Sequence, residues 1–370
     1  MDSSTTNNTM NLANNNSVTA PIYNSTNATN GYGGSETWPE HVIGIQDWCL
    51  VAAFIIIMIS GVAGNLLVIY VFGKKKNKRS VDLLTLNLGI VDLMASIFNP
   101  PLNIYWILTN FQKWHLGDLG CKILPAIGPT MTTASGWVLL IFAVERYNAI
   151  VKPFSSRFSQ KVIMIACLAS VLGSAAMYVP YVHGIQKEYG KCTFPDPRIP
   201  EYGYPNCAFI IVRLLAFIMI FSSTNIHIYR TLRKSKQCFS AKELREMRTK
   251  QSKRVMRTLS MMGIAFGVLV FPRELLYLIY NISDLIHRDC SDAVISLWLV
   301  QLNSWLKVMH TSNSCANIFI YANMQDTYKR QIRKIMEWVA VAIVTVSETV
   351  TSNSFTTRII KGCERQLNPI

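Results

Sequence analysis

The chain has 370 residues, of which 50% are hydrophobic and only 15% are charged. Soluble domains usually carry about 25% charged residues, so a soluble globule of this composition would lack groups to cover its surface. The formal net charge of +15 would suit a nucleic-acid partner, but the placement of these charges along the chain favours another explanation.

The first 45 residues are predicted to form a disordered extracellular tail, because they are rich in Asn, Ser, Thr and Gly and hold no long apolar run. No positively charged start with an apolar centre marks a cleavable signal peptide. Four Asn-x-Ser/Thr sequons, at Asn7, Asn15, Asn24 and Asn27, are candidate glycosylation sites. A tail of this composition also generates sequons by chance, so they agree with an outer location without establishing it.

Seven apolar blocks follow the tail, near residues 48–72, 82–109, 122–146, 162–182, 207–230, 255–282 and 293–322. Crossing the roughly 30 Å core of a bilayer takes about 20 helical residues, and each block is long enough. Strands of a β-barrel would alternate in polarity, and residues 54–59 do not. We therefore predict an all-α membrane protein, with a seven-transmembrane helix bundle over residues 46–322.

The connections between these blocks differ in charge. The four segments on one side hold 24 Lys and Arg residues, whereas those on the other side hold 5. Cytoplasmic loops carry such an excess, so the N-terminus is predicted to lie outside and the C-terminus inside. The charge is thus explained as an orientation signal, and we expect no nucleic-acid partner.

Five cysteines fall on or near the predicted outer, oxidising side: Cys49, Cys121, Cys192, Cys207 and Cys290. Cys121 opens the third block and Cys192 lies in the middle of an outer loop, so we expect these two to form a disulfide. The pairing of the other three stays open, with Cys49 and Cys290 as a candidate second bridge.

Six short motifs occur in order, each in its own block or the loop beside it: Gly64-Asn65-Leu66-Leu67-Val68, Leu88-Gly89-Ile90-Val91-Asp92, Trp114-His115-Leu116-Gly117 before Cys121, Glu145-Arg146-Tyr147, Phe271-Pro272, and Asn317-Ile318-Phe319-Ile320-Tyr321. No single motif is specific. Together they resemble the rhodopsin-like (class A) G-protein-coupled receptors over residues 45–337, in a divergent form similar to the peptide receptors.

The resemblance implies a G-protein-coupling site at the inner end of the third span. Arg146 would pair with Glu145 at rest, beside Tyr147, and would point into a cavity for the G-protein α subunit on activation. Tyr229 and Tyr321 would then lie near it. A plain anchor at the membrane edge is the alternative, because Arg and Tyr favour that interface.

The resemblance also implies an activation switch and a candidate ion site. Pro272 would kink the sixth span as a pivot, and Asn317 and Tyr321 would belong to the same switch. An ionised Asp92 in mid-span would cost about 3 kcal/mol or more. The family places a sodium ion there, with Asp92, Ser135, Asn313 and Asn317 as the matching residues. A neutral acid in a hydrogen-bond network is the alternative, and no other cofactor is expected.

The sequence departs from the family at the switch. Val270 stands where a Trp is usual, Ile318 replaces the Pro of the seventh span, Phe221 stands where the fifth span usually has Pro, and the fourth span has no Trp. A non-signalling or constitutively active membrane interaction protein of the same fold therefore remains an alternative function.

The predicted ligand pocket contains Gly128, Thr132, Arg213, Arg273, Glu274 and Lys307. In the family that the chain resembles, amine receptors carry an Asp at the position of Gly128, and opsins carry a retinal-binding Lys at the position of Thr311. The resemblance therefore implies that the ligand is neither an amine nor retinal. Three cations and one acid in the outer halves of spans favour a ligand with an anionic group, such as a peptide. Snorkelling of these long side chains to the interface, or pairing within the bundle, is the alternative.

The inner side is strongly basic over residues 230–257, which suits either a G protein or anionic lipid. Residues 323–338 have the spacing of a short amphipathic eighth helix on the inner leaflet. Residues 339–370 form a predicted cytoplasmic tail whose Ser and Thr could be phosphorylated for an arrestin-like partner.

The sequence thus predicts a plasma-membrane receptor that binds an extracellular ligand, expected to be a peptide, and activates a heterotrimeric G protein. It contains no nucleophile–base pair, metal cluster or phosphate loop, so no enzyme is predicted. A transporter would show two inverted repeats with broken helices, and none is visible in the sequence.

Overall fold

The computed structural model describes residues 43–109, 113–152, 158–188, 190–234, 242–286, 297–324 and 328–334, together with residues 337 and 341. The four tail sequons, Cys290 and the Ser/Thr-rich segment near the C-terminus lie outside the described residues.

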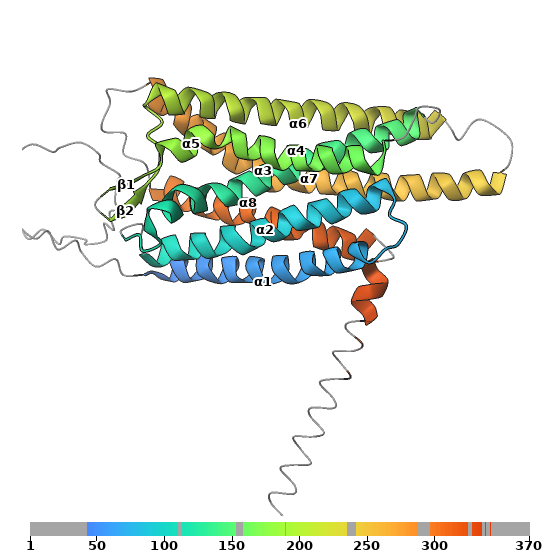
Figure 1. Ribbon diagram of the computed structural model, residues 1–370, viewed down its shortest axis with the longest axis horizontal. Helices are drawn as coiled ribbons and strands as arrows, with labels where there is room; N and C mark the ends of the chain where they lie inside the picture. The colour runs from blue at the N-terminus through green and yellow to red at the C-terminus, as the bar shows by residue number, and fades with distance from the viewer. Residues whose placement is uncertain are drawn as a thin grey trace, which may run out of the picture.

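Long helices lying side by side make up the molecule (Figure 1). They are α1 (Ile45–Gly73), α2 (Ser80–Thr109), α3 (Gly117–Val151), α4 (Gln160–Met177), the short α5 (Val179–Gly184), α6 (Pro200–Lys234), α7 (Lys242–Ile286) and α8 (Leu297–Met324). Helix α3 is central, because it packs against α2, α4, α6, α7 and α8. The N-terminal part of α7 extends beyond the other helices at the end opposite the hairpin (Figure 1).

Six of the described helical segments are long and apolar enough to cross a membrane; α4 and α5 together count as one of them, Gln160–Gly184. Helix α8 has 28 residues but is more polar. Its polar side chains lie inside the bundle, where His310, Asn313 and Asn317 are each almost fully buried. The predicted seventh span is therefore present as a helix, and its low hydropathy reflects the polar groups that it contributes to the interior.

The fourth span is interrupted at Tyr178, where α4 ends and α5 begins with a proline in its first turn. Proline is tolerated in a first turn because its missing N–H has no helical partner there. At its other end, α4 is capped by Ser159, whose hydroxyl accepts a hydrogen bond from the backbone N–H of Val162 at 3.3 Å.

A two-stranded antiparallel hairpin covers one end of the bundle (Figure 1). Strands β1 (Gln186–Glu188) and β2 (Lys191–Thr193) pair with Lys187 opposite Cys192. Gly190 in the turn has a φ of +76°, a conformation that favours glycine. Its carbonyl accepts a 2.8 Å hydrogen bond from the backbone N–H of Trp114. A disulfide between Cys121 of α3 and Cys192 fixes the hairpin over the helices.

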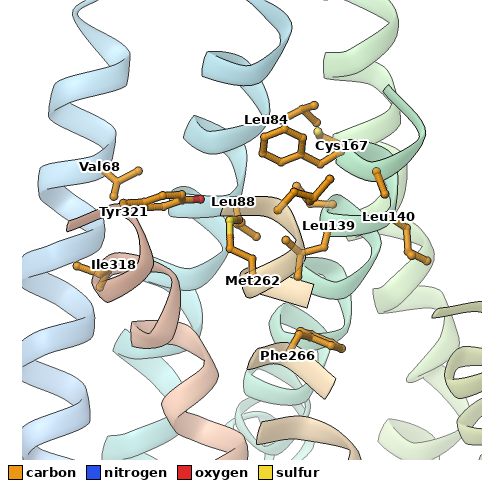
Figure 2. Packing of buried hydrophobic residues seen from close by; sticks show 14 of the residues in the cluster. Val68, Leu84, Leu88, Leu139, Leu140, Cys167, Met262, Phe266, Ile318 and Tyr321 are labelled. Carbon is orange, nitrogen blue, oxygen red and sulfur yellow. The ribbon is translucent and has the colours of Figure 1, made fainter. Parts of the chain in front are cut away.

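The main hydrophobic core contains buried side chains from α1, α2, α3, α4, α6, α7 and α8, some of which Figure 2 shows. Figure 2 shows Tyr321 of α8 lying beside Val68 of α1. A Cβ atom added at Gly64 would overlap the side chain of Ile318, so the glycine of α1 provides the hollow that this isoleucine fills. The short helix at 328–334 is attached to the same region by Tyr328, whose hydroxyl donates to the carbonyl of Gly64 at 3.2 Å.

Candidate functional site

A buried ion pair crosses the half of the bundle that lies nearer the hairpin. Arg213 of α6 pairs with Glu274 of α7, and each side chain is only 8% exposed. His310 of α8 adds a contact of 3.3 Å between its Nε2 atom and the second carboxylate oxygen of Glu274. These three side chains connect α6, α7 and α8 directly outward of Pro272.

Arg213 is held by neutral groups as well. Its guanidinium donates to Thr133 of α3 at 2.6 Å and to the hydroxyl of Tyr178 at 3.5 Å, and it lies 5.0 Å from the ring centre of Phe209. A buried charge without partners costs several kcal/mol, and removing one member of a buried pair exposes that cost. The cluster therefore stabilises one relative position of the helices that supply it.

Two further cations lie close to this pair. Arg273 follows Pro272 on α7, and its Nε atom is buried without a hydrogen-bond partner among the described residues. Lys307 precedes His310 by one turn of α8 and is partly buried. Among the described side chains, the predicted charged residues of the ligand pocket thus form one group with three cations and a single carboxylate.

Two other residues of the predicted pocket, Gly128 and Thr132, are both buried in α3. A Cβ atom at Gly128 would overlap Asn99 of α2, whose side chain occupies the space that the glycine leaves. Thr132 is 4% exposed and donates to the carbonyl of Gly128 at 3.2 Å. The structure therefore places Gly128 against α2, because its missing side chain makes room for Asn99, and it buries Thr132 within α3.

Asp92 lies at the centre of the bundle with one satisfied and one unsatisfied oxygen. Asn317 donates to Asp92 Oδ2 at 2.8 Å, whereas Asp92 Oδ1 and the hydroxyl of Ser135 are buried and have no hydrogen-bond partner in the described part of the chain. Asn313 is buried as well. Unpartnered carboxylate and hydroxyl oxygens are the donor types that a hard cation takes, so the residues present fit a small cation.

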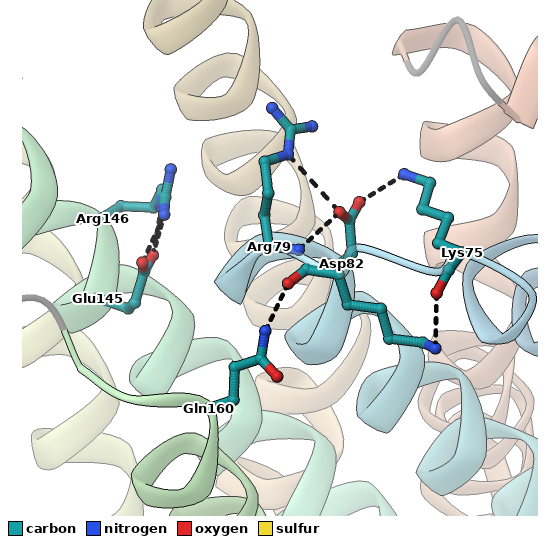
Figure 3. A network of polar contacts seen from close by, with 7 residues as sticks. Lys75, Arg79, Asp82, Glu145, Arg146 and Gln160 are labelled. Atoms are coloured by element: carbon teal, nitrogen blue, oxygen red, sulfur yellow. Dashed lines mark hydrogen bonds and ion pairs between the residues drawn. The ribbon is translucent and has the colours of Figure 1, made fainter.

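At the inner end of α3, Glu145 and Arg146 form an ion pair in which both carboxylate oxygens accept from the guanidinium (Figure 3). The Arg146 side chain is 17% exposed. Tyr147 contacts the ring of His227 on α6 edge-on, at 6.0 Å between centroids. Tyr147, the last residue of the predicted coupling motif, therefore packs between α3 and α6.

Of the two tyrosines predicted to lie near Arg146, one is buried in the bundle and the other is exposed on its surface. Tyr321 is buried, with its ring 6.0 Å from that of Tyr328, and its hydroxyl has no hydrogen-bond partner among the described residues. Tyr229 is 67% exposed and points out of the bundle, because the next residue before it, Ile228, takes the buried position on α6. The structure thus does not bring Tyr229 to Arg146.

Sequence reasoning missed a second polar network on the inner side (Figure 3). Asp82 of α2 accepts from Lys75 at 2.6 Å and from the backbone N–H of Arg79 at 3.0 Å. Gln160 at the start of α4 donates to the carbonyl of Lys78 at 2.7 Å. These bonds fix the basic loop between α1 and α2. An aspartate in the first turn of a helix, after a run of lysines, was the signal available in the sequence.

It also missed an aromatic cluster between α6 and α7, just inward of Pro272. Phe217 stacks on Phe221 at 5.3 Å and on Phe266 at 4.8 Å, and Phe271 meets Phe217 edge-on at 5.4 Å. These rings fill the level at which the usual tryptophan is replaced by Val270, a fully buried residue.

The rings fit because two glycines make room for them. A Cβ atom at Gly263 of α7 would overlap the ring of Phe221, and one at Gly136 of α3 would meet Phe266. The phenylalanine in the position of the usual proline is thus a packing element between two helices.

Comparison with known proteins agrees with the bundle and with its motifs. The family model of the seven-transmembrane receptors of the rhodopsin family matches residues 64–321. The chain belongs to this family, whose members are G-protein-coupled receptors and not enzymes.

The relatives found by sequence share about a quarter of their residues with it. Bombesin receptor subtype-3 of Ovis aries is 25% identical over 310 residues, which cover 78% of this chain and 75% of that receptor. The allatostatin-A receptor of Bombyx mori is 25% identical over 293 residues, covering 75% and 76%. Galanin receptor type 1 of Homo sapiens is 24% identical over 331 residues, covering 82% and 88%.

Among solved structures, the crystal structure of squid rhodopsin superposes with a TM-score of 0.65 over 86% of this chain and 92% of that one. The sequence identity is 20%, so this likeness concerns the fold.

Proposed function

We propose that this chain is a plasma-membrane receptor that binds an extracellular peptide and activates a heterotrimeric G protein. The observation that carries the proposal is the Glu145–Arg146 pair at the inner end of α3, in a bundle whose opposite half holds the buried Arg213–Glu274 pair with Arg273 beside it. One end thus has a group suited to a G protein, and the other has groups suited to a ligand.

The orientation follows from the distribution of charge. The end with the Glu145–Arg146 pair also carries the Lys- and Arg-rich connections, and such connections face the cytoplasm. The hairpin, its disulfide and the tail with four sequons then face the outside, where disulfides persist.

The proposed ligand is a peptide with an anionic group. The relatives are named as receptors for bombesin, allatostatin-A and galanin, which supports a ligand of the same chemical class. Among the described residues, Arg213 and Arg273 outnumber Glu274 in a region of low dielectric, where an added carboxylate is favoured. A carboxylate of the peptide would complete the bonding of Arg273, whose Nε atom has no hydrogen-bond partner.

Binding would reach the inner end through α7. A ligand carboxylate that bonds Arg213 or Arg273 competes with Glu274, which weakens the connection between α6 and α7. Pro272 lies next to these residues and lacks the hydrogen bond that would stiffen the helix. The phenylalanine cluster would then repack, and the inner end of α7 would move away from α8, where Arg254 now donates to the carbonyl of Met324 at 3.0 Å.

A sodium ion bound by Asp92, Ser135, Asn313 and Asn317 would stabilise the resting arrangement by satisfying the unpartnered oxygens. The test is the effect of sodium, against a potassium control, on basal signalling of the wild-type chain and of Asp92→Asn. We expect sodium to lower the signal of the wild type only. An equal effect on both would remove the ion from the proposal.

Coupling itself is tested by G-protein dissociation in cells that express the full chain, across a panel of α subunits, with and without a peptide library. We expect a signal that Arg146→Ala changes at least tenfold and that Lys161→Ala, an exposed basic residue at the inner end of α4, leaves within twofold. Surface labelling of each variant controls for expression.

The alternative function rests on Val270 and Ile318, which replace parts of the usual switch. A strong signal without peptide that Arg146→Ala abolishes would identify a constitutively active receptor. Silence across the panel with normal surface expression would identify a non-signalling membrane interaction protein and would overturn the proposed coupling.

A further inference from the structure

A dense group of cations lies on the loop between α1 and α2, at the end of the bundle opposite the hairpin (Figure 1). Residues 74–79 supply Lys74, Lys75, Lys76, Lys78 and Arg79. Among the described residues, Asp82 is the only carboxylate that pairs with this loop, with Lys75 at 2.6 Å and Arg79 at 3.6 Å. The loop therefore keeps an excess of positive charge after its own ion pairs are counted.

The loop is folded around the buried carboxylate of Asp82, whose side chain is 4% exposed. Asp82 accepts from Lys75 Nζ and, at 3.0 Å, from the backbone N–H of Arg79 (Figure 3). Lys78 Nζ donates to the carbonyl of Lys75 at 2.9 Å. These bonds fix the backbone that carries the cations, so the distances between the cations are set by the fold.

Helix α4 holds the loop from the other side. Gln160 Nε2 donates to the carbonyl of Lys78 at 2.7 Å (Figure 3). The next residue, Lys161, is exposed, and so are Lys74, Lys76 and Arg79. We call these four exposed cations, together with the partly exposed Lys78, the inner basic patch.

Two helix N-termini add to the positive potential of the inner basic patch. Helix α2 begins at Ser80, directly after the loop, and α4 begins at Gln160, which is bonded to the loop. The N-terminal end of a helix carries a partial positive charge and favours anions such as phosphate. The side chains and the backbone thus favour the same kind of occupant.

The inner basic patch lies at the level of lipid headgroups. Tyr70 of α1 is 53% exposed, and Lys74 Nζ lies 4.2 Å from its ring centre and donates to its hydroxyl at 3.0 Å. Exposed tyrosines at the ends of spans lie at the boundary between the bilayer and water. Because Lys74 is held against such a tyrosine, an occupant that reaches it is a lipid headgroup.

The number of cations indicates which headgroup fits. A headgroup with a single negative charge has no use for five cations at fixed spacing, whereas one with several phosphates bonds more than one of them. Arginine adds paired hydrogen bonds to phosphate oxygens. Clusters of four to eight Lys and Arg residues just inside a span are typical of phosphoinositide binding.

We propose that the inner basic patch is a binding site for the headgroup of a phosphoinositide lipid, with Asp82 and Gln160 as positioning residues. The inference goes beyond receptor signalling and rests only on the proposed orientation, which places the patch at the inner leaflet. One bound lipid would connect the inner ends of α1, α2 and α4.

The test is native mass spectrometry of the purified full chain in detergent, with short-chain dioctanoyl lipids added in pairs. Dioctanoyl phosphatidylinositol bisphosphate is measured against dioctanoyl phosphatidylinositol and dioctanoyl phosphatidylserine. We expect the bisphosphate to bind about tenfold more tightly than either, because only its headgroup carries several phosphates.

One pair of variants locates the site. Lys76→Gln removes an exposed cation of the patch and should weaken binding of the bisphosphate about fivefold, the usual contribution of one cation near anionic lipid. The matched control is Lys253→Gln, the same change at an exposed lysine on the N-terminal part of α7. It should leave the affinity within about twofold, because this part of α7 extends beyond the other helices.

A second pair separates a built site from general attraction between charges. Asp82→Asn adds one net positive charge, so general attraction predicts tighter binding, whereas release of Lys75 and Arg79 from their fixed positions predicts weaker binding. Gln160→Ala changes no charge and alters an exposed side chain, so it keeps the test valid if Asp82→Asn fails to fold. We expect both variants to bind the bisphosphate more weakly than the wild type.

Three results would overturn the site: equal binding of the bisphosphate and phosphatidylserine, equal losses in Lys76→Gln and Lys253→Gln, or unchanged or tighter binding in Gln160→Ala. The measurement needs no peptide and no G protein, so it can fail or succeed independently of the proposed function. Selective lipid binding in a chain that gives no signal would count against coupling alone.

Discussion

Replacing Glu274 by glutamine should destabilise the protein strongly, although the two side chains have nearly the same shape. The change removes the only described carboxylate paired with Arg213, and both side chains are 8% exposed. Breaking a buried pair from one side costs about 3–5 kcal/mol, because the remaining charge is left without compensation. A charge at mid-membrane costs about 3 kcal/mol on insertion scales, which agrees.

A second substitution distinguishes the effect of the uncompensated charge on stability from the effect of side-chain packing. Replacing Arg213 by methionine in the Glu274→Gln background removes the uncompensated cation, so most of the lost stability should return, to within about 1 kcal/mol of the wild type. The matched control is Asp118→Asn, which makes the same chemical change in an exposed pair with Lys187. Exposed pairs contribute about 0–1 kcal/mol.

The assay is thermal unfolding of the purified receptor in detergent, followed with a thiol-reactive dye that labels the buried free cysteines Cys167 and Cys315 as they become accessible. Unfolding of such a protein is expected to be irreversible, so all variants are compared at one scan rate. A loss of 3–5 kcal/mol corresponds to a fall of roughly 10 °C in the midpoint.

The reasoning is refuted if Glu274→Gln shifts the midpoint no more than Asp118→Asn does. It is also refuted if the double variant is less stable than Glu274→Gln. In that case the cluster would act through packing of Arg213 and not through compensation of charge.

Two further predictions concern packing and covalent constraint. Gly263→Ala should lower the stability by about 1–3 kcal/mol in the same unfolding assay, because the new methyl group overlaps the ring of Phe221. The control is Gly173→Ala, in open space on α4, which should be neutral or stabilising by up to about 1 kcal/mol. Equal effects of the two substitutions would contradict the packing argument. Cys121→Ser removes the disulfide that closes a loop of 71 residues, which corresponds to about 4 kcal/mol of loop entropy. Surface expression, measured by antibody labelling, should therefore fall severalfold. Expression at the wild-type level would show that the bridge to Cys192 is dispensable.

The number and order of the spans could be predicted from the sequence because bilayer thickness imposes a length on every crossing helix. The apolar blocks, the charge asymmetry and the short motifs are all local features, readable within about 25 residues. The Glu145–Arg146 pair is also local, since its two members are adjacent. The cysteines Cys121 and Cys192 are 71 positions apart, and their bridge was expected because both fall at the predicted outer end.

The contacts inside the bundle could not be predicted from the sequence, because they join residues of different helices. The sequence identified Arg213 and Glu274 as charged positions in a pocket but could not show that they pair with each other, because 61 positions separate them and a rotation of either helix by one residue would part them. Nor could it show that the side chain of Asn99, on the neighbouring helix, lies in the space beside Gly128.

The aromatic contacts show most clearly the difference between what the sequence predicts and what only the tertiary structure decides. Phe217, Phe221 and Phe266 look like ordinary apolar residues of two spans, and only the approach of α6 and α7 at Gly263 turns them into a stack. The sequence by itself determined the helices, their topology and the chemistry available at each end, since these follow from hydropathy, charge and adjacency. The tertiary structure alone decided which side chains touch, because contact between helices depends on rotation and separation, which no single helix encodes.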